Sequence, residues 1–197
     1  MSTKQGKVQS VSSGFEKTLA PTMSMVVGPL GCGKSADSIY SMPRALFVAS
    51  SGSVELPGEN LVGFRPQIFI CNNFGAQEII EIVGKAASAK LEAVVIDDWG
   101  LTAENTWRRE KNASKGGWAF WDRLDEIFHN FCFAGREAGI HVLMHAHPKA
   151  GYTTDKGETL PGGAKMPMKK LTVELPKVFD QVLLVRPAGS VVAGQHP

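Results

Sequence analysis

The feature that most constrains this sequence is a glycine-rich turn directly after a short apolar run. Residues 23–27 read MSMVV, and the next eight residues are Gly28, Pro29, Leu30, Gly31, Cys32, Gly33, Lys34 and Ser35. They match the P-loop pattern Gly-x-x-x-x-Gly-Lys-Ser/Thr, in which a buried strand leads through a phosphate-binding turn into a helix. The pattern therefore predicts a strand, a turn and a helix in immediate succession, as in α/β proteins.

The residue types of this turn predict its chemistry. Glycines let successive backbone N–H groups point at one phosphate, and a helix that starts near Ala36 adds the positive end of its dipole. Lys34 is expected to reach the β- and γ-phosphates, and Ser35 to bind Mg²⁺. We predict that the stretch from Gly28 to Ala36 binds a nucleotide; a glycine-rich turn without a ligand is the alternative.

A second apolar run ends in two acidic residues. Residues 93–96 read AVVI, without the polar alternation of a half-exposed strand, and Asp97 and Asp98 follow. A P-loop site needs a carboxylate on the metal side at the end of a neighbouring buried strand. This Walker-B pattern predicts that Asp97 binds Mg²⁺. Asp98 is predicted to orient or deprotonate the attacking water, or alternatively to cap a turn or helix.

Further runs complete an alternating α/β pattern. Helices are expected over 77–90 and 117–138, with Gly139 ending the second and with Trp118 and Trp121 on its buried apolar stripe. The segments 99–116 and 148–172 are predicted to be long loops, which are usually functional. The six expected strands cover 23–27, 45–49, 67–71, 93–96, 141–144 and 182–185.

The overall composition excludes several classes of protein. Hydrophobic residues make up 43% and charged residues 20% of 197 residues, which suits one globular domain and not a disordered or coiled-coil chain. We expect a flexible arm over 1–21 and one core over 22–197. No apolar run approaches the roughly 20 residues that span a bilayer. The N-terminus also lacks an apolar signal segment, and three scattered cysteines suit a reducing compartment, so a soluble cytoplasmic protein is expected.

Aromatic and basic residues are interleaved after Asp98. All four tryptophans lie between positions 99 and 121, and the segment 148–172 holds five lysines against two acidic residues. Such a mixture suits single-stranded nucleic acid, because bases stack on aromatic rings and cations bind phosphates. The alternatives for the second segment are a solvated loop and a lysine that reaches the nucleotide of a neighbouring subunit. The residues predicted to bind DNA are Trp107, Arg108, Arg109, Lys111, Lys115, Lys149, Lys156, Lys165, Lys169 and Lys170.

Four stretches resemble the RecA-type core ATPases, and more narrowly the small phage-encoded RecA-like proteins of single-strand annealing and recombination. They are GPLGCGKS, VVIDDWG, HVLMHAHP and PGGAKMPMKKLTVELPKVFDQVLLV, within residues 23–187. The resemblance implies a RecA-like, mostly parallel sheet flanked by helices, with ATP and Mg²⁺ as cofactors. It also implies a ring or filament of identical subunits on single-stranded DNA, partner proteins of recombination such as a single-strand-binding protein, and the cytoplasm of a host cell.

The resemblance also assigns the histidines at the end of the fifth run. In a RecA-like sheet this strand lies between the P-loop strand and the Walker-B strand, so that its tip is near the γ-phosphate. His147 is therefore the first choice for a residue that senses hydrolysis and His145 the second; a structural role is the alternative for either. Zinc is disfavoured, because His141 and His145 stand about 13 Å apart on an extended strand.

One departure from the family concerns the catalytic base. RecA-type enzymes usually carry a glutamate at the tip of the strand before the Walker-B strand, where this sequence has Ile70, Cys71, Asn72 and Asn73. Hydrolysis is then slow, or Asp98 replaces the glutamate. The predicted function is an ATP- and Mg²⁺-dependent ATPase that binds single-stranded DNA in recombination, annealing or replication. The alternatives are a P-loop kinase of small molecules or nucleotides and a nucleotide-gated assembly or packaging ATPase.

Overall fold

A parallel sheet forms the centre of the protein. The computed structural model describes residues 20–50, 67–71, 73–113, 117–150, 152–153, 159–160, 163–165 and 179–185. Six strands pair in the order β10-β1-β5-β4-β2-β3, and all these pairs are parallel. They are β1 (Met23–Val27), β2 (Ala45–Ala49), β3 (Gln67–Ile70), β4 (Ala93–Asp97), β5 (His141–Ala146) and β10 (Gln181–Leu184). The six predicted strands are confirmed, with their ends shifted by two residues at most.

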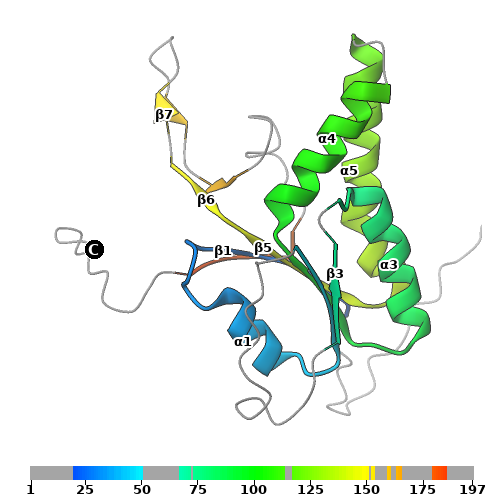
Figure 1. The fold of residues 1–197 in the computed structure, drawn as a ribbon, viewed down its shortest axis with the longest axis vertical. Coiled ribbons are helices and arrows are strands. Elements are labelled where there is room, and N and C mark those ends of the chain that lie inside the picture. The colour runs from blue at the N-terminus through cyan, green and yellow to red at the C-terminus, as the bar shows by residue number, and fades with distance from the viewer. Residues whose placement is uncertain are drawn as a thin grey trace, which may run out of the picture.

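Helices cover both faces of this sheet (Figure 1). The helix α1 (Lys34–Ser41) packs on one face, while α3 (Ala76–Ser88), α4 (Trp99–Ala113) and α5 (Trp118–Ala138) pack on the other. Successive side chains of a strand point to opposite faces. Val94 and Ile96 of β4 belong to the hydrophobic cluster that includes residues of α3, α4 and α5, whereas Val95 belongs to the cluster with Ile39 of α1, so Asp97 lies on the α1 face. Met144 and Leu143 of β5 divide in the same way, which leaves His145 on the α1 face. The alternation of two strands therefore places an acid and a histidine beneath α1.

The core between α5 and the sheet is tightly packed. The ring of Trp99 stacks on Phe131 with centroids 4.5 Å apart and meets Phe128 edge-on. Where α5 crosses β5, a Cβ atom at Gly135 would lie 2.6 Å from Val142 Cγ2 and 3.0 Å from the Ile140 carbonyl oxygen. The helix then ends at Gly139, whose φ of 71° is left-handed, as predicted.

This packing predicts the effect of a single added methyl group. Gly135→Ala is expected to lower the free energy of unfolding by about 1–3 kcal/mol, because the Cβ atom forces α5 away from β5. Gly84→Ala is the matched control, since Gly84 is also helical but a Cβ atom there meets nothing within 4 Å. The control is expected to gain up to about 1 kcal/mol from helix propensity. Urea unfolding measures both, and equal stability of the two variants would contradict the packing described.

The predicted loop over 99–116 is wrong, because α4 occupies 99–113. Its buried stripe consists of Trp99, Thr102, Ala103 and Thr106. Because two of these residues are polar threonines, the stripe does not show the apolar spacing by which a helix is predicted. The Thr106 hydroxyl donates to the Thr102 carbonyl and accepts from the Ala76 N–H at 2.8 Å. Hydrogen bonding thus takes the place of the apolar side chains by which a buried helix face is recognised.

The assignment of Trp118 and Trp121 to the core is also wrong, since they are 85% and 48% exposed. The buried stripe of α5 begins instead at Phe120 and continues through Leu124 and Ile127. Figure 1 shows that α4 and the start of α5 run side by side and project beyond the sheet. The prediction failed because helical spacing does not show how far a helix extends past its sheet.

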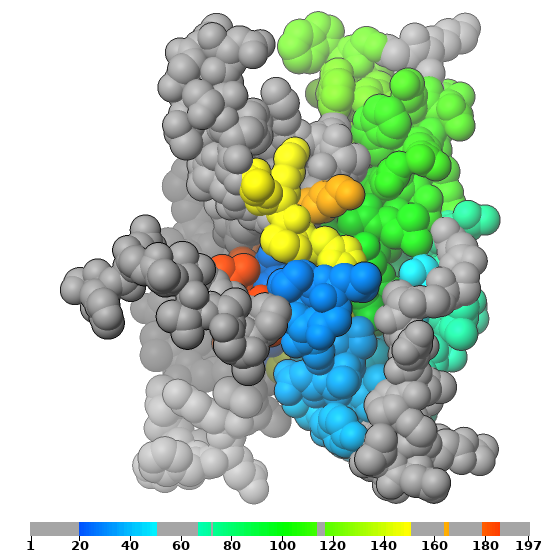
Figure 2. Space-filling model, turned by 60° about the vertical axis from the view of Figure 1, so that its left-hand side comes forward, coloured from blue at the N-terminus to red at the C-terminus, as the bar shows by residue number. Residues whose placement is uncertain are grey.

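The segment after β5 contains short antiparallel strands, so the prediction of one long loop over 148–172 needs correction. The strand β6 (Pro148–Lys149) pairs with β9 (Gly163–Ala164), and β7 (Tyr152–Thr153) pairs with β8 (Thr159–Leu160). Two-residue strands are too short to produce an alternating pattern. Figure 2 shows β6 and β9, in yellow and orange, between β1 and its turn, in blue, and α4, in green.

Cys32, Cys71 and Cys132 are free thiols in the structure. Among the described helices, none is both long and apolar enough to cross a bilayer.

Candidate functional site

The glycine-rich turn connects β1 to α1 as the pattern predicts. Gly31 and Gly33 have φ angles of 74° and 90°, a region that favours glycine. Within the described part of the chain, no side chain caps the first turn of α1, which begins at Lys34, so its N–H groups are available to an anion. The Lys34 ammonium donates to the carbonyl oxygens of Gly28 at 2.8 Å and Pro29 at 3.0 Å. The cation and the helix start thus lie at one turn, the arrangement that a phosphate group requires.

The predicted metal ligands meet beneath this turn. The Ser35 hydroxyl donates to Asp97 Oδ2 at 2.5 Å. Burial raises the pKa of Asp97, but its contacts with His145, Ser35 and Lys34 outweigh burial and leave the pKa below its usual value. A hydroxyl next to an ionised carboxylate is a donor set that Mg²⁺ prefers. The residues present therefore fit Mg²⁺.

His145, the second choice for a sensor, is the histidine that lies beside Asp97, the acid predicted to bind the metal ion. Its side chain is fully buried, its Nε2 lies 2.8 Å from the Ser38 hydroxyl, and its Nδ1 lies 3.6 Å from Asp97 Oδ2. The 3.6 Å separation is too long for a hydrogen bond. Among the described residues, no group of three His, Cys, Asp or Glu side chains is arranged to hold a metal ion.

His147, the first choice, lies beside the second acid. Its Nε2 is 3.7 Å from Asp98 Oδ2, and both side chains are partly exposed. The other carboxylate oxygen of Asp98 accepts from the Gly100 N–H at 2.6 Å, so Asp98 also caps the first turn of α4. Both predicted roles of Asp98 are therefore compatible with the structure, because each uses a different oxygen.

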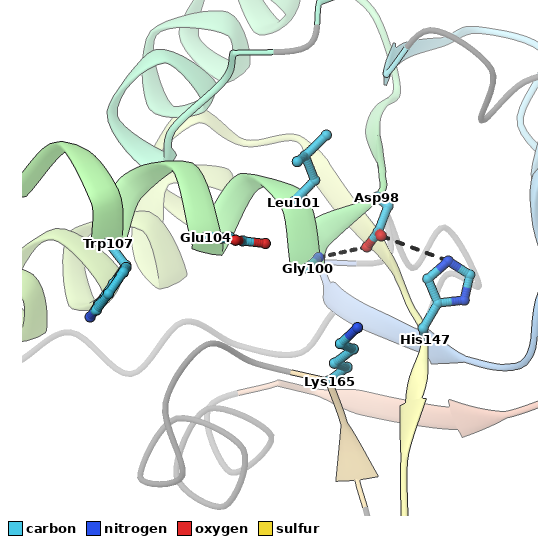
Figure 3. Close-up of a pocket in the computed structure, with 7 residues that line it drawn as sticks. All are labelled: Asp98, Gly100, Leu101, Glu104, Trp107, His147 and Lys165. Atoms are coloured by element: carbon cyan, nitrogen blue, oxygen red, sulfur yellow. Dashed lines mark hydrogen bonds and ion pairs between the residues drawn. The ribbon is translucent and has the colours of Figure 1, made fainter.

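A cleft of 520 Å³ opens next to this histidine–aspartate pair (Figure 3). The Lys165 N–H donates to the His147 carbonyl at 2.7 Å, which brings Lys165 into the cleft. A Cβ atom at Gly100 would lie 3.2 Å from Asp98 Oδ1 and 3.4 Å from the Lys165 carbonyl, so a small residue permits this approach. The cleft is lined by Asp98, Gly100, Leu101, Glu104, Trp107, His147 and Lys165.

The residues predicted to bind DNA are distributed over different surroundings. Trp107 and Lys165 line the cleft, and Lys111 Nζ lies 4.7 Å from the centre of the Trp107 ring. Arg108 pairs with Glu104 on the same helix. Arg109 instead bonds to Glu78 and to the Asn73 carbonyl, and so joins α4 to α3. Lys149 is described at the end of β6, whereas Lys115, Lys156, Lys169 and Lys170 lie outside the described residues.

Sequence reasoning did not find the cluster of Asp98, His147, Lys165 and Glu104. Its members lie directly after β4, within α4, between β5 and β6, and directly after β9, so no local spacing connects them. It also assigned the exposed tryptophans of α5 to the core, although the interleaving of tryptophans with basic residues was a signal for an exposed surface. The tip of β3, where RecA-type enzymes usually carry a glutamate, has no glutamate among its described residues. A small cavity at this tip is lined by Cys71 and Asn105, among others. The carboxylates among its described lining residues are those of Asp97 and Asp98.

Comparisons with known proteins show which fold this architecture shares. No family model matches the sequence, and no curated protein matches it. A solved structure of the RadB recombinase aligns over 84% of this chain and 74% of that chain, with a TM-score of 0.50 and 17% sequence identity. The fold is RecA-like. The predicted fold class is thereby confirmed, including the insertion of β5 between β1 and β4.

Proposed function

We propose that this protein is an ATP- and Mg²⁺-dependent ATPase that binds single-stranded DNA and acts in recombination, annealing or replication as an assembly of identical subunits. The observation that carries the proposal is the Ser35–Asp97 contact directly beneath the P-loop turn, with Asp98 and His147 beside it. The name of the RadB recombinase agrees with a role in recombination.

The proposed chemistry assigns one task to each group. The N–H groups of the turn and the Lys34 ammonium bind the phosphates, and Ser35 and Asp97 hold the metal ion. Bound Mg²⁺ would neutralise negative charge on the β- and γ-phosphates. Asp98 Oδ2 is the oxygen free of the α4 cap, and it lies next to His147, so this pair is suited to orient water and accept its proton.

The proposed DNA interface combines the cleft with the projecting helices. Trp107 offers a ring and Lys165 a cation in the cleft, while Trp118 and Trp121 are exposed at the start of α5. Bases stack on such rings without sequence preference. Because His147 and Asp98 also line the cleft, a strand bound there would contact the groups proposed to act on water.

This proposal predicts stimulation of hydrolysis by DNA. ATP turnover by the full chain is expected to rise several-fold when single-stranded DNA is added. The double substitution Lys169→Ala with Lys170→Ala is expected to weaken DNA binding about tenfold at low salt, because two cations that bind phosphates are lost. Its affinity for ATP is expected to stay unchanged. Lys85→Ala is the control, because Lys85 is exposed in the last turn of α3, at the amino end of the neighbouring β4. Phosphate release and DNA titration at several salt concentrations measure these effects. A rate of ATP turnover that does not change when DNA is added would contradict the proposal.

A small-molecule or nucleotide kinase is the second candidate, favoured by the carboxylates of the cleft. Asp98 and Glu104 both line it, and its volume of 520 Å³ is within the range of small-ligand sites. An acceptor hydroxyl would be activated by Asp98 as a general base. Phosphate transfer from ATP to small acceptors, without DNA stimulation, would favour this candidate.

A further inference from the structure

We propose that the cleft next to α4 binds the edge of one unstacked base, and that Glu104 selects bases with an exocyclic amino group over thymine and uracil. The inference rests on the proposed function, because it takes bound single-stranded DNA as the source of the base. It adds a base preference, which the proposed function does not include.

The charged groups of the cleft do not suit a phosphate backbone. Of the lining residues in the described part of the chain, Asp98 and Glu104 carry carboxylates, whereas Lys165 supplies an ammonium group. Arg108, which pairs with Glu104, is not among these lining residues. Phosphates bind where cations are in excess, and a phosphate in this cleft would lie beside two carboxylates. The cleft is therefore suited to the uncharged part of a nucleotide, which is its base.

Two side chains of the cleft have opposite hydrogen-bonding character. The Glu104 carboxylate only accepts hydrogen bonds, and the Lys165 ammonium only donates them. Figure 3 shows that they extend into the same space, one from α4 and the other from the residue after β9. The Oε1 atom of Glu104 lies 2.5 Å from Arg108 Nη2, which holds the carboxylate in place. Its Oε2 atom has no hydrogen-bond partner among the described residues and can accept from a ligand.

This pair of side chains matches the edge of cytosine. Cytosine places its N4 amino donor beside the acceptors N3 and O2, whereas thymine and uracil have the acceptor O4 in place of the amino group. Acceptance of a hydrogen bond from N4 is the contact by which Glu and Asp recognise cytosine. The same carboxylate beside O4 would bring two acceptors together. Adenine also has an amino donor beside a ring acceptor, so the preference is for amino bases and not for cytosine alone.

The remaining residues of the cleft suit the ring of the base and the adjacent phosphate. The volume of 520 Å³ is ample for one base, and Leu101 and Trp107 offer apolar contact with its ring. Lys111 Nζ lies 4.7 Å from the centre of the Trp107 ring, which keeps a cation near the cleft for the phosphate that flanks the base. Stacking on aromatic rings tolerates any sequence, so a preference must come from hydrogen bonds inside the cleft.

Two oligonucleotides that differ by one group on each base test this preference. Oligomers of deoxycytidine and of deoxyuridine differ only in the amino group or oxygen at C4 and in the N3 proton that accompanies the oxygen. Fluorescence anisotropy with the full chain, Mg²⁺ and a non-hydrolysable ATP analogue measures both affinities. We expect the deoxycytidine oligomer to bind about tenfold more tightly, because a specific base contact discriminates by about this factor. Equal affinities would overturn the inference, and this comparison needs no variant.

Substitution of Glu104 tests whether this residue makes the selection. Glu104→Gln keeps an acceptor but adds a donor that suits O4, so the two oligomers should bind it within about twofold of each other. Glu110→Gln is the matched control, because it removes the same charge from the same helix and Glu110 is not among the lining residues of the cleft. This control should keep the preference for deoxycytidine. A preference that survives in Glu104→Gln, or that is lost in Glu110→Gln as well, would overturn the inference.

Free nucleotides distinguish a failure of this inference from a failure of the proposed function. Isothermal titration with deoxycytidine and deoxyuridine monophosphates, with the ATP analogue occupying the P-loop, measures binding of a base that is not part of a strand. If neither oligomer binds but deoxycytidine monophosphate binds more tightly than deoxyuridine monophosphate, the DNA-binding function is wrong and the base selection stands. If both oligomers bind equally, the base selection is wrong and DNA binding stands. If no oligomer and no monophosphate binds, both are wrong.

Discussion

Lys34→Ala is expected to lower the affinity for ATP with Mg²⁺ by about 100-fold and to abolish measurable hydrolysis. Hydrogen bonds to a charged group are worth about 1.5–3 kcal/mol each, and the ammonium is predicted to reach both the β- and the γ-phosphate. Isothermal titration with ATP measures the affinity, and phosphate release measures turnover. Unchanged values would show that the turn after β1 is not a nucleotide site.

The control for this substitution concerns the turn itself. The Lys34 ammonium also donates to the Gly28 and Pro29 carbonyls, so its removal is expected to loosen the turn slightly. Lys34→Arg keeps the charge but not the compact ammonium, and it should recover little binding. Thermal unfolding of both variants should stay close to that of the unsubstituted protein. A large fall in melting temperature together with lost binding would indicate a structural cause instead.

Trp118→Ala with Trp121→Ala is expected to weaken single-stranded DNA binding by tenfold or more. Each base stacked on an aromatic ring contributes about 1–3 kcal/mol, and these rings are 85% and 48% exposed. Because they lie outside the buried stripe of α5, stability and ATP affinity should be little changed. Fluorescence anisotropy with a labelled oligonucleotide measures the loss.

Two controls make this result specific. Trp118→Phe with Trp121→Phe keeps aromatic faces and should restore most of the affinity, while Tyr40→Ala removes a half-exposed ring from α1 on the opposite face of the sheet and should have no effect. The dependence of affinity on salt should keep its slope in the alanine variant, since no phosphate contact is lost. An unchanged affinity for DNA in the alanine variant would show that the start of α5 is not part of the DNA interface.

Local pattern was sufficient wherever a short stretch of chain specifies its own conformation. The apolar runs that became β1 and β4, the glycines at 31 and 33 and the terminating Gly139 all act within a few residues, so strands, turn and helix end were predictable. Local pattern does not predict the order of the strands in the sheet. That order was instead implied by the resemblance to RecA-type proteins. It placed β5 between β1 and β4, as the structure confirms.

The amino-acid sequence by itself thus determined the strands of the sheet, the P-loop turn and the acids at the end of β4, because these depend on neighbouring residues. Only the tertiary structure decided which histidine meets which acid, that Lys165 enters the cleft, and that Trp118 lies in solvent. The physical reason is that these contacts join segments far apart in the chain. The pairing of distant strands, the length of a helix relative to the sheet and the approach of one backbone to another set them, and none of these leaves a local signal.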